Sequence, residues 1–209
     1  MKKFFAYVSM RSSNSNTYYE KRDAISYDWI NYYEKNLISP IFVPNSFNKL
    51  ESFLNDFSAN GLILTNGDDI NENYSRKKTE QILIKYSIQK KIPIIGFCRG
   101  FQMLNDYFGG RTKKIQNNSH SNEEHKIKII DSLNNNIKTK SFSTKCYHNF
   151  AITNKTIAKS LVPFAISQDG LIEGAYHKSL PIIGIQWHPE RQNRKINEKI
   201  LNFWKRSCT

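Results

Sequence analysis

The feature of the sequence that most directly suggests chemistry is Cys98, which lies between two glycines in the run GFCRG (96–100). An apolar run, IPII, precedes it, and apolar residues at helical spacing follow it. A strand that turns abruptly into a helix strains the backbone at the turn and requires small neighbours. The thiol would then project at a helix N-terminus, whose positive end favours the thiolate. We therefore predict that Cys98 is a nucleophile and that the backbone N–H of Arg99 binds an oxyanion.

A base for this thiol is found in the segment GIQWHPE (184–190), which contains His188 and Glu190. The segment continues a second apolar, strand-like run, and the carboxyl ends of parallel strands are where such sites form. Glu190 can orient the imidazole and stabilise its charged form, while Pro189 stiffens the chain between them. The sequence thus predicts a triad of Cys98, His188 and Glu190.

These motifs resemble those of class I glutamine amidotransferase domains, and the resemblance covers nearly the whole chain. It is carried by GFCRGFQMLN followed by GG, and by GIQWHPE near the end. Because an arginine follows the cysteine, the motif most resembles that of the γ-glutamyl hydrolase branch of the family. The resemblance implies a cysteine hydrolase that cleaves a γ-glutamyl amide through a γ-glutamyl thioester and needs no cofactor.

Three further segments are similar to the family's oxyanion and substrate-binding segments, with departures. In GLILTNGDD, Asn66 replaces the first glycine of a Gly-Gly pair, so Gly67 is the implied second oxyanion donor. In TKCYHNF, His148 matches a Ser-x-His-x-Gln pattern, but Cys146 and Phe150 replace its Ser and Gln. The segment DGLIE resembles an acidic Asp-Gly-x-x-Glu segment. The resemblance implies that the glutamyl group is held by Gln102, the backbone of Cys146, Tyr147 and His148, and Glu173.

The segments around these motifs predict an α/β fold, because strand-like and helix-like patterns alternate along the chain. Strands are predicted at Phe4–Ser9, Ile38–Val43, Gly61–Leu64, Pro93–Phe97 and Pro181–Gln186, and helices at Asp23–Lys35, 46–57, Lys78–Lys90, Phe101–Phe108 and 197–206. Shorter strand-like segments between 126 and 177 predict a small antiparallel extension. We expect a single three-layer domain over residues 1–209, with a mostly parallel sheet flanked by helices and a mobile polar loop at QNNSHSNEEH (116–125).

Composition bounds the class of protein. The apolar part of the N-terminal KKFFAYVSM is too short for a signal peptide, and no apolar run is long enough to span a membrane. Three widely spaced cysteines favour reduced thiols over a disulfide framework. We expect a cytoplasmic protein. The histidines at 120 and 125 lack the H-E-x-x-H spacing, so no metal site is predicted.

The net charge of +13 leaves two interpretations, a solvated lysine-rich surface or an anionic partner. No nucleic-acid-binding motif is recognisable, so nucleic acid is not expected. Arg11 and Arg22 bracket the predicted first strand-to-helix loop, where they could contact a phosphate. Within the family, the chain is similar to hydrolases that release a cytidine diphosphoramidate, and the charge disfavours a cationic γ-glutamyl polyamine.

Other functions stay open from sequence alone. They are a γ-glutamyl polyamine or folate hydrolase, a glutaminase subunit that delivers ammonia to a separate synthetase, and a non-catalytic basic binding protein on the same scaffold. The complete triad argues against the last of these.

Overall fold

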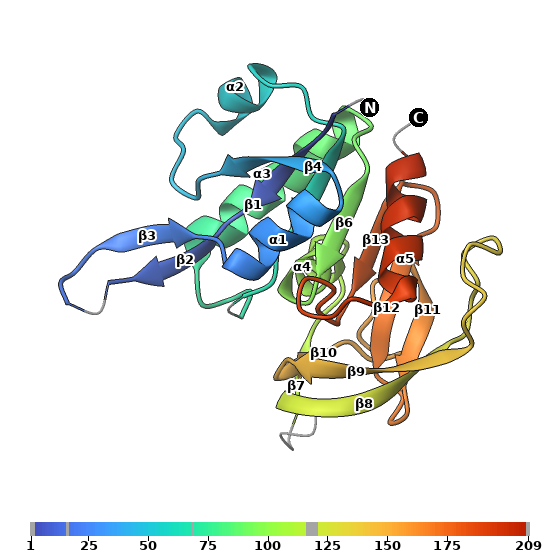
Figure 1. The fold of residues 1–209 in the computed structure, drawn as a ribbon. Helices are drawn as coiled ribbons and strands as arrows, with labels where there is room; N and C mark the ends of the chain where they lie inside the picture. The colour runs from blue at the N-terminus through green and yellow to red at the C-terminus, as the bar shows by residue number, and fades with distance from the viewer. Residues whose placement is uncertain (1–2, 16, 68, 116–120, 208–209) are drawn as a thin grey trace.

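The computed structural model describes residues 3–15, 17–67, 69–115 and 121–207 (Figure 1). Its helices are α1 (Tyr27–Lys35), α2 (Leu50–Asn55), α3 (Tyr74–Gln89), α4 (Arg99–Tyr107) and α5 (Lys195–Arg206). Its strands are β1 (Phe4–Ser9), β2 (Arg11–Asn14), β3 (Lys21–Ala24), β4 (Ile38–Val43), β5 (Gly61–Leu64), β6 (Ile94–Phe97), β7 (Lys113–Lys114), β8 (Ser121–Ile129), β9 (Ser141–Tyr147), β10 (Phe150–Ala151), β11 (Leu161–Ser167), β12 (Ile172–His177) and β13 (Ile182–Ile185).

The main sheet has nine strands in the order β4-β1-β5-β6-β13-β12-β11-β8-β9. The first five strands are parallel, and β13 is the junction, because it pairs in parallel with β6 and antiparallel with β12. The predicted α/β architecture with an antiparallel extension is confirmed. Residues that follow β5, β6 and β13 therefore meet at the carboxyl edge of the parallel part, where the candidate catalytic residues lie.

Two cores flank the parallel strands, because successive strand side chains point to opposite faces. Ala6 and Val8 of β1 pack in a core with α1 and α5, whereas Tyr7 between them packs in a core with α2, α3 and α4. Buried residues of α5 recur at helical spacing, at Ile196, Ile200 and Trp204, so one stripe of the helix faces the sheet. These layers hold the carboxyl edge of the sheet in place.

Several predicted boundaries are wrong. The helix predicted to begin at Asp23 begins later, because Asp23 and Ala24 belong to a strand, β3, which forms a hairpin with β2 (Figure 1). The Asp23 carboxylate accepts hydrogen bonds from the backbone N–H and side chain of Asn45, which fixes this extended segment and delays α1 to Tyr27. The second helix is shorter than predicted and begins at Leu50.

The polar segment 116–125 was predicted to be a loop, but residues from 121 onward belong to β8, which pairs with β9. The remainder of that segment, 116–120, lies outside the described residues. An alternation of polar residues carries no strand signal when neither face is strongly apolar, which explains the error.

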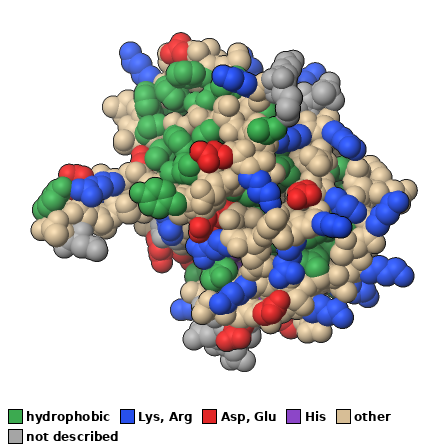
Figure 2. Space-filling model, in the orientation of Figure 1, with side chains coloured by type: hydrophobic (Ala, Val, Ile, Leu, Met, Phe, Trp, Pro, Cys, Tyr) green, Lys and Arg blue, Asp and Glu red, His purple; other side chains and the backbone are tan. Residues whose placement is uncertain are grey.

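The surface agrees with a basic composition. Figure 2 shows Lys and Arg side chains distributed over much of this face, interspersed with acidic ones, and the β2–β3 hairpin standing away from the body. In the part of the chain that the structure describes, no helix is both long and apolar enough to cross a membrane.

Candidate active site

Cys98 occupies a tight turn between β6 and α4, with φ 51° and ψ −105°. A positive φ is uncommon for a residue with a side chain. The flanking glycines make the turn possible, since a Cβ on Gly96 would lie 2.7 Å from the backbone of Gly100, and one on Gly100 would collide with the carbonyl of Leu64. The Cys98 N–H donates to the Ile185 carbonyl at 2.7 Å, which ties the turn to β13. The thiol is 5% exposed and lies at the N-terminus of α4.

His188 and Glu190 form a buried pair at the end of β13. Nδ1 of His188 lies 2.7 Å from Oε1 of Glu190, and the two side chains are 4% and 0% exposed. Gln186, on the same segment, places its Nε2 3.6 Å from Sγ of Cys98. The ring of Tyr147 packs edge-on against the imidazole, with 5.3 Å between ring centroids. The three predicted catalytic residues are therefore brought to one place.

The surroundings of His188 favour its protonated form. Burial alone would lower its pKa, but the negative charges of Cys98 and Glu190, and the hydrogen bond to Glu190, raise the pKa to about 10. An imidazole held in this way can keep the thiol proton and pass it to a leaving group.

Asn66 is a further side chain in contact with this pair. Its Nδ2 lies 2.7 Å from Oε1 of Glu190 and 2.9 Å from Nδ1 of His188. The amide orientation is set by Trp29, whose indole N–H donates to Oδ1 of Asn66 at 3.0 Å. When Nδ1 of His188 carries its proton, the Asn66 amide can donate only to Glu190, so it holds the carboxylate against the imidazole.

Gly67, the predicted oxyanion donor, follows Asn66 in a conformation that suits glycine, with φ 139°. A Cβ at this position would lie 2.5 Å from Nη1 of Arg76. The guanidinium of Arg76 also donates from Nη2 to the carbonyls of Thr65 and Asn66, each at 3.0 Å. The hydrogen bonds from the buried Arg76 therefore fix the start of the loop after β5, and this positions the Gly67 backbone.

The same arginine belongs to a fully buried ionic network with Glu80 and Arg99. Nε of Arg76 lies 3.1 Å from Oε1 of Glu80, and Nη1 of Arg99 donates to the other carboxylate oxygen. Although burial raises the pKa of Glu80, the two guanidiniums lower it below its usual value. The Arg99 side chain is therefore used by the scaffold, and its N–H is among the first of α4, which have no acceptor within the helix.

Several of the residues predicted to hold the glutamyl group lie close to one another. Gln102 donates from Nε2 to the Phe150 carbonyl at 3.1 Å, and Nδ1 of His148 lies 3.0 Å from the same carbonyl. Nε2 of His148 is 3.7 Å from Oε1 of Glu173. Except for the partly buried Tyr147, the side chains of this predicted set are buried.

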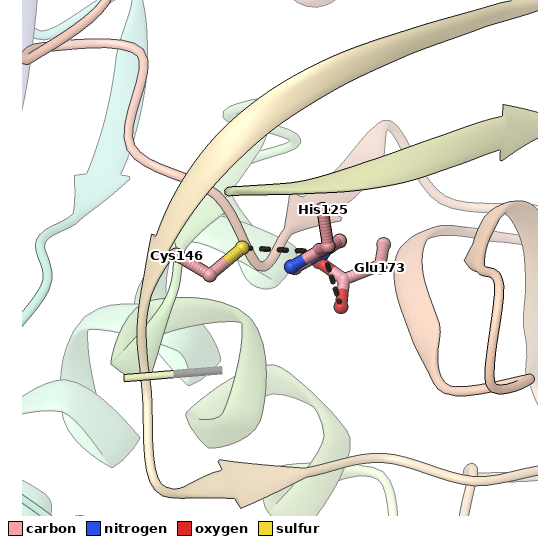
Figure 3. A group of neighbouring side chains, drawn as sticks. All are labelled: His125, Cys146 and Glu173. Atoms are coloured by element: carbon pink, nitrogen blue, oxygen red, sulfur yellow. Dashed lines mark hydrogen bonds and ion pairs between the residues drawn. The ribbon is translucent and has the colours of Figure 1, made fainter. Parts of the chain in front are cut away.

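Cys146 and Glu173 also face His125, a residue that the sequence did not indicate. Figure 3 shows the three side chains pointing toward one another, with His125 joined to the other two. Nε2 of His125 lies 3.3 Å from Sγ of Cys146 and 3.5 Å from Oε1 of Glu173. Burial and the charge of Glu173 raise the pKa of the Cys146 thiol well above its ordinary value.

The two predicted phosphate-binding arginines differ in position. The side chain of Arg11 reaches Gly67, since a Cβ on that glycine would be 3.4 Å from Cβ and Nε of Arg11. Arg22 instead contacts its own hairpin, pairing with Glu20 and donating to the Tyr18 hydroxyl at 2.6 Å. Only Arg11 of the two is placed against the candidate oxyanion loop.

The whole chain is similar to known glutamine amidotransferases. The family model for class-I glutamine amidotransferase matches residues 19–206. The γ-glutamyl-CDP-amidate hydrolase of Campylobacter jejuni is 30% identical over an alignment of 211 positions, which includes 96% of this chain and 96% of that one. The glutamine-hydrolysing GMP synthase of Methanococcus maripaludis has one subunit that is 26% identical over 166 residues, covering 79% of this chain and 82% of that one.

A solved structure shares the fold. The crystal structure of a putative GMP synthase subunit from Thermoplasma acidophilum superposes with a TM-score of 0.76 at 21% identity, covering 100% of this chain and 95% of that chain.

Proposed function

The chain belongs to the class I glutamine amidotransferase family, and from this premise we propose that it is a cysteine hydrolase of γ-glutamyl amides. The observation that carries the proposal is the meeting of Cys98, at a strained turn on a helix N-terminus, with the buried His188–Glu190 pair. A thiol, a base and an orienting carboxylate are the groups that nucleophilic cleavage of an amide requires.

In the first half of the reaction, the sulfur of Cys98 attacks the γ-carbonyl carbon of the glutamyl group. The C–S bond forms while an electron pair moves onto the carbonyl oxygen, which accepts hydrogen bonds from the N–H groups of Gly67 and Arg99. His188, which has taken the thiol proton, gives it to the leaving nitrogen as the C–N bond breaks. A γ-glutamyl thioester remains on Cys98.

In the second half, water attacks the thioester carbonyl and transfers a proton to His188. The C–S bond breaks, glutamate leaves, and the Cys98–His188 pair is restored. Glu190 stabilises the imidazolium in both halves, and the Asn66 amide keeps its carboxylate in place. Gln102, Glu173 and the backbone of residues 146–148 hold the α-amino and α-carboxylate ends of the glutamyl group.

We propose that the leaving group is anionic, as in γ-glutamyl-CDP-amidate, which would yield glutamate and cytidine diphosphoramidate. Two observations support this substrate: the relative of that name spans 96% of the chain, and Arg11 lies against the candidate oxyanion loop. The net charge of +13 favours an anionic substrate over a cationic γ-glutamyl polyamine.

The second candidate is a glutaminase subunit that delivers ammonia to a separate synthetase. It is favoured by the similarity to one subunit of a glutamine-hydrolysing GMP synthase. The two candidates differ in their leaving group, ammonia or a nucleotidyl-amidate, and in their need for a partner.

A substrate panel tests the proposal. Purified protein is given γ-glutamyl-CDP-amidate, glutamine, a γ-glutamyl polyamine and a γ-glutamyl folate, and glutamate release is measured as kcat/KM. We expect the nucleotidyl-amidate to be cleaved at least about tenfold more efficiently than the others. Efficient glutamine turnover only with added synthetase would support the second candidate, and no turnover of any substrate would exclude both enzymes.

A further inference from the structure

The cluster of His125, Cys146 and Glu173 brings three metal-ligating atoms together outside the catalytic triad (Figure 3). The side chains come from β8, β9 and β12, and one ligand atom from each lies within 4.8 Å of the others. Cys146 and Glu173 are fully buried, whereas the His125 side chain is 12% exposed, which offers a path for an ion to enter. The proposed function assigns Glu173 to holding the glutamyl group, but none of the three ligand atoms takes part in a bond-making step, and the second carboxylate oxygen of Glu173 would stay available to the substrate when the first binds an ion.

Two of the three distances among these atoms fit a tetrahedral zinc ion. Zinc bonds of about 2.3 Å to sulfur and about 2.0–2.2 Å to nitrogen or oxygen put sulfur and nitrogen about 3.6 Å apart at a tetrahedral angle, and nitrogen and oxygen about 3.4 Å apart. The corresponding distances here are 3.3 Å, from Nε2 of His125 to Sγ of Cys146, and 3.5 Å, from the same nitrogen to Oε1 of Glu173. These two distances agree within a few tenths of an ångström. The third, from Sγ of Cys146 to a carboxylate oxygen of Glu173, is at most 4.8 Å, against about 3.6 Å in a tetrahedral site, so the carboxylate closes on the sulfur when the ion binds.

A bound cation also explains why the three ligand atoms lie so close together better than hydrogen bonds among them do. One imidazole nitrogen holds at most one proton, so Nε2 of His125 can make a full hydrogen bond with the thiol or with the carboxylate, and a proton shared between both makes two weaker ones. An ion at the centre contacts all three atoms at once. With Zn²⁺, a thiolate, a carboxylate and a neutral imidazole, the buried group carries no net charge.

We infer that His125, Cys146 and Glu173 form a zinc site. Thiolate, imidazole and carboxylate are ligands that zinc accepts together, whereas magnesium and calcium select oxygen alone. The thiol proton of Cys146 is released to solvent when the Zn–S bond forms. The fourth position falls to water or to His148, whose Nε2 is 3.7 Å from Oε1 of Glu173.

Such an ion would join three strands of the antiparallel part of the sheet. It would fix the backbone of residues 146–148, which the proposed function assigns to the glutamyl group, and leave that backbone free to contact substrate. The site goes beyond the proposed hydrolase activity, and its existence can be tested without any substrate.

The test is metal content, measured by mass spectrometry on untagged protein dialysed against metal-free buffer after exposure to ZnCl₂. We expect about one zinc per chain in the wild type and in Cys98→Ala. Cys146→Ser and Glu173→Gln should each retain less than about a tenth of that amount, with circular dichroism used to confirm that they are folded. In the wild type, Co²⁺ in place of zinc should give a sulfur-to-cobalt charge-transfer band that is absent from Cys146→Ser.

Clear outcomes overturn the inference. One is wild-type protein that holds no zinc above the level of Cys146→Ser. Another is zinc that is lost from Cys98→Ala but kept by Cys146→Ser, which would place the ion at the catalytic thiol. Wild-type protein that binds one zinc through Cys146 but cleaves no γ-glutamyl amide would overturn only the proposed function, so the two failures can be told apart.

Discussion

Glu80 and Glu173 are both fully buried carboxylates near Cys98, but their surroundings differ in kind. Glu80 lies between the guanidiniums of Arg76 and Arg99, which are charged at any pH the protein meets. The groups around Glu173 are His125, His148 and the Cys146 thiol, which can gain or lose protons or bind a metal.

This difference separates a fixed region from an adaptable one. The charge of Glu80 is balanced by guanidiniums that do not lose their protons. One of them, Arg76, also donates hydrogen bonds to the carbonyls of Thr65 and Asn66, which fixes the backbone next to the oxyanion loop. Around Glu173 the charge balance depends on what is bound. We infer that the first region supports the transition state, whereas the second responds to ligands.

The largest difference in activity is expected between variants of the two buried thiols. Cys98 lies beside the first region, and Cys146 lies in the second. Cys98→Ala should leave the fold intact and remove at least about a thousandfold of activity, because the covalent nucleophile is lost. Cys146→Ala should reduce kcat/KM far less. The measurement is glutamate release, with peptide mapping after limiting iodoacetamide to show which thiol reacts first. Turnover like that of the wild type in Cys98→Ala, or preferential labelling of Cys146 or Cys208, would contradict the assignment.

Stability should distinguish the two carboxylates. Glu80→Gln leaves two buried guanidiniums without a counter-charge and should lower the free energy of unfolding by about 3–5 kcal/mol. Glu173→Gln should lower it by less than about 2 kcal/mol, because the side chains against this carboxylate are imidazoles rather than permanently charged guanidiniums. Urea unfolding of both variants provides the measurement. Equal losses would show that the two regions are equally structural.

The pH dependence of stability should report the charge of His188. Its pKa is about 10 in the folded protein and near 6.5 when unfolded, so its contribution to the free energy of unfolding is complete below about pH 6.5. That contribution declines above this pH and is lost as the pH passes about 10. The unfolding free energy of wild type minus that of His188→Gln should therefore shrink between pH 7 and 10, by a few kcal/mol at most. A constant difference would mean that the folded histidine is neutral.

Asn66 connects the fixed region to the triad, because its carbonyl accepts from Arg76 and its side chain donates to Glu190. The Asn66→Ala variant should show how much the hydrogen bond to Glu190 contributes to catalysis. Loss of a hydrogen bond to a carboxylate costs about 1.5–3 kcal/mol, or ten- to a hundredfold in kcat/KM, expressed mainly in kcat. Asn73→Ala is the matched control, since it removes the cap of α3 and should cost about 1 kcal/mol of stability without changing kcat. If both variants lose kcat equally, Asn66 acts through the fold.

The smallest effect is expected outside both regions, on the β2–β3 hairpin. Arg11→Ala should lower kcat/KM about tenfold on γ-glutamyl-CDP-amidate and hardly at all on glutamine, which has no phosphate. Arg22→Ala is the control, because its contacts lie within the hairpin. The loss should decrease at high salt, as it does for exposed charge contacts. Equal losses on the two substrates would assign Arg11 a role in the fold instead.

Much of the site could be predicted because its signals are local. The glycines around Cys98 and the two-residue spacing of His188 and Glu190 are visible in short stretches, and each follows an apolar strand. The same reasoning correctly predicted the parallel strands, whose buried residues are consecutive.

The rest depended on contacts between distant segments. Asn66 and Glu190 are 124 residues apart, and no local pattern indicates that they touch. The cluster of His125, Cys146 and Glu173 arises from the curvature of the antiparallel strands, which periodicity does not describe. The hairpin was predicted as a loop, with Asp23 and Ala24 assigned to the next helix, because its polar residues bury little apolar surface and its position depends on Asn45 instead.

The packing of the two glycines around Cys98 also bears on how such an enzyme can change over evolution. A side chain at Gly96 or Gly100 would meet backbone atoms, which cannot move aside as a flexible side chain could. These positions accept one residue type, so mutation has almost no room to vary the nucleophile's surroundings from the helix side. Under the proposed function, we therefore expect changes of substrate to arise elsewhere in the chain, in the hairpin or in the strands around Glu173.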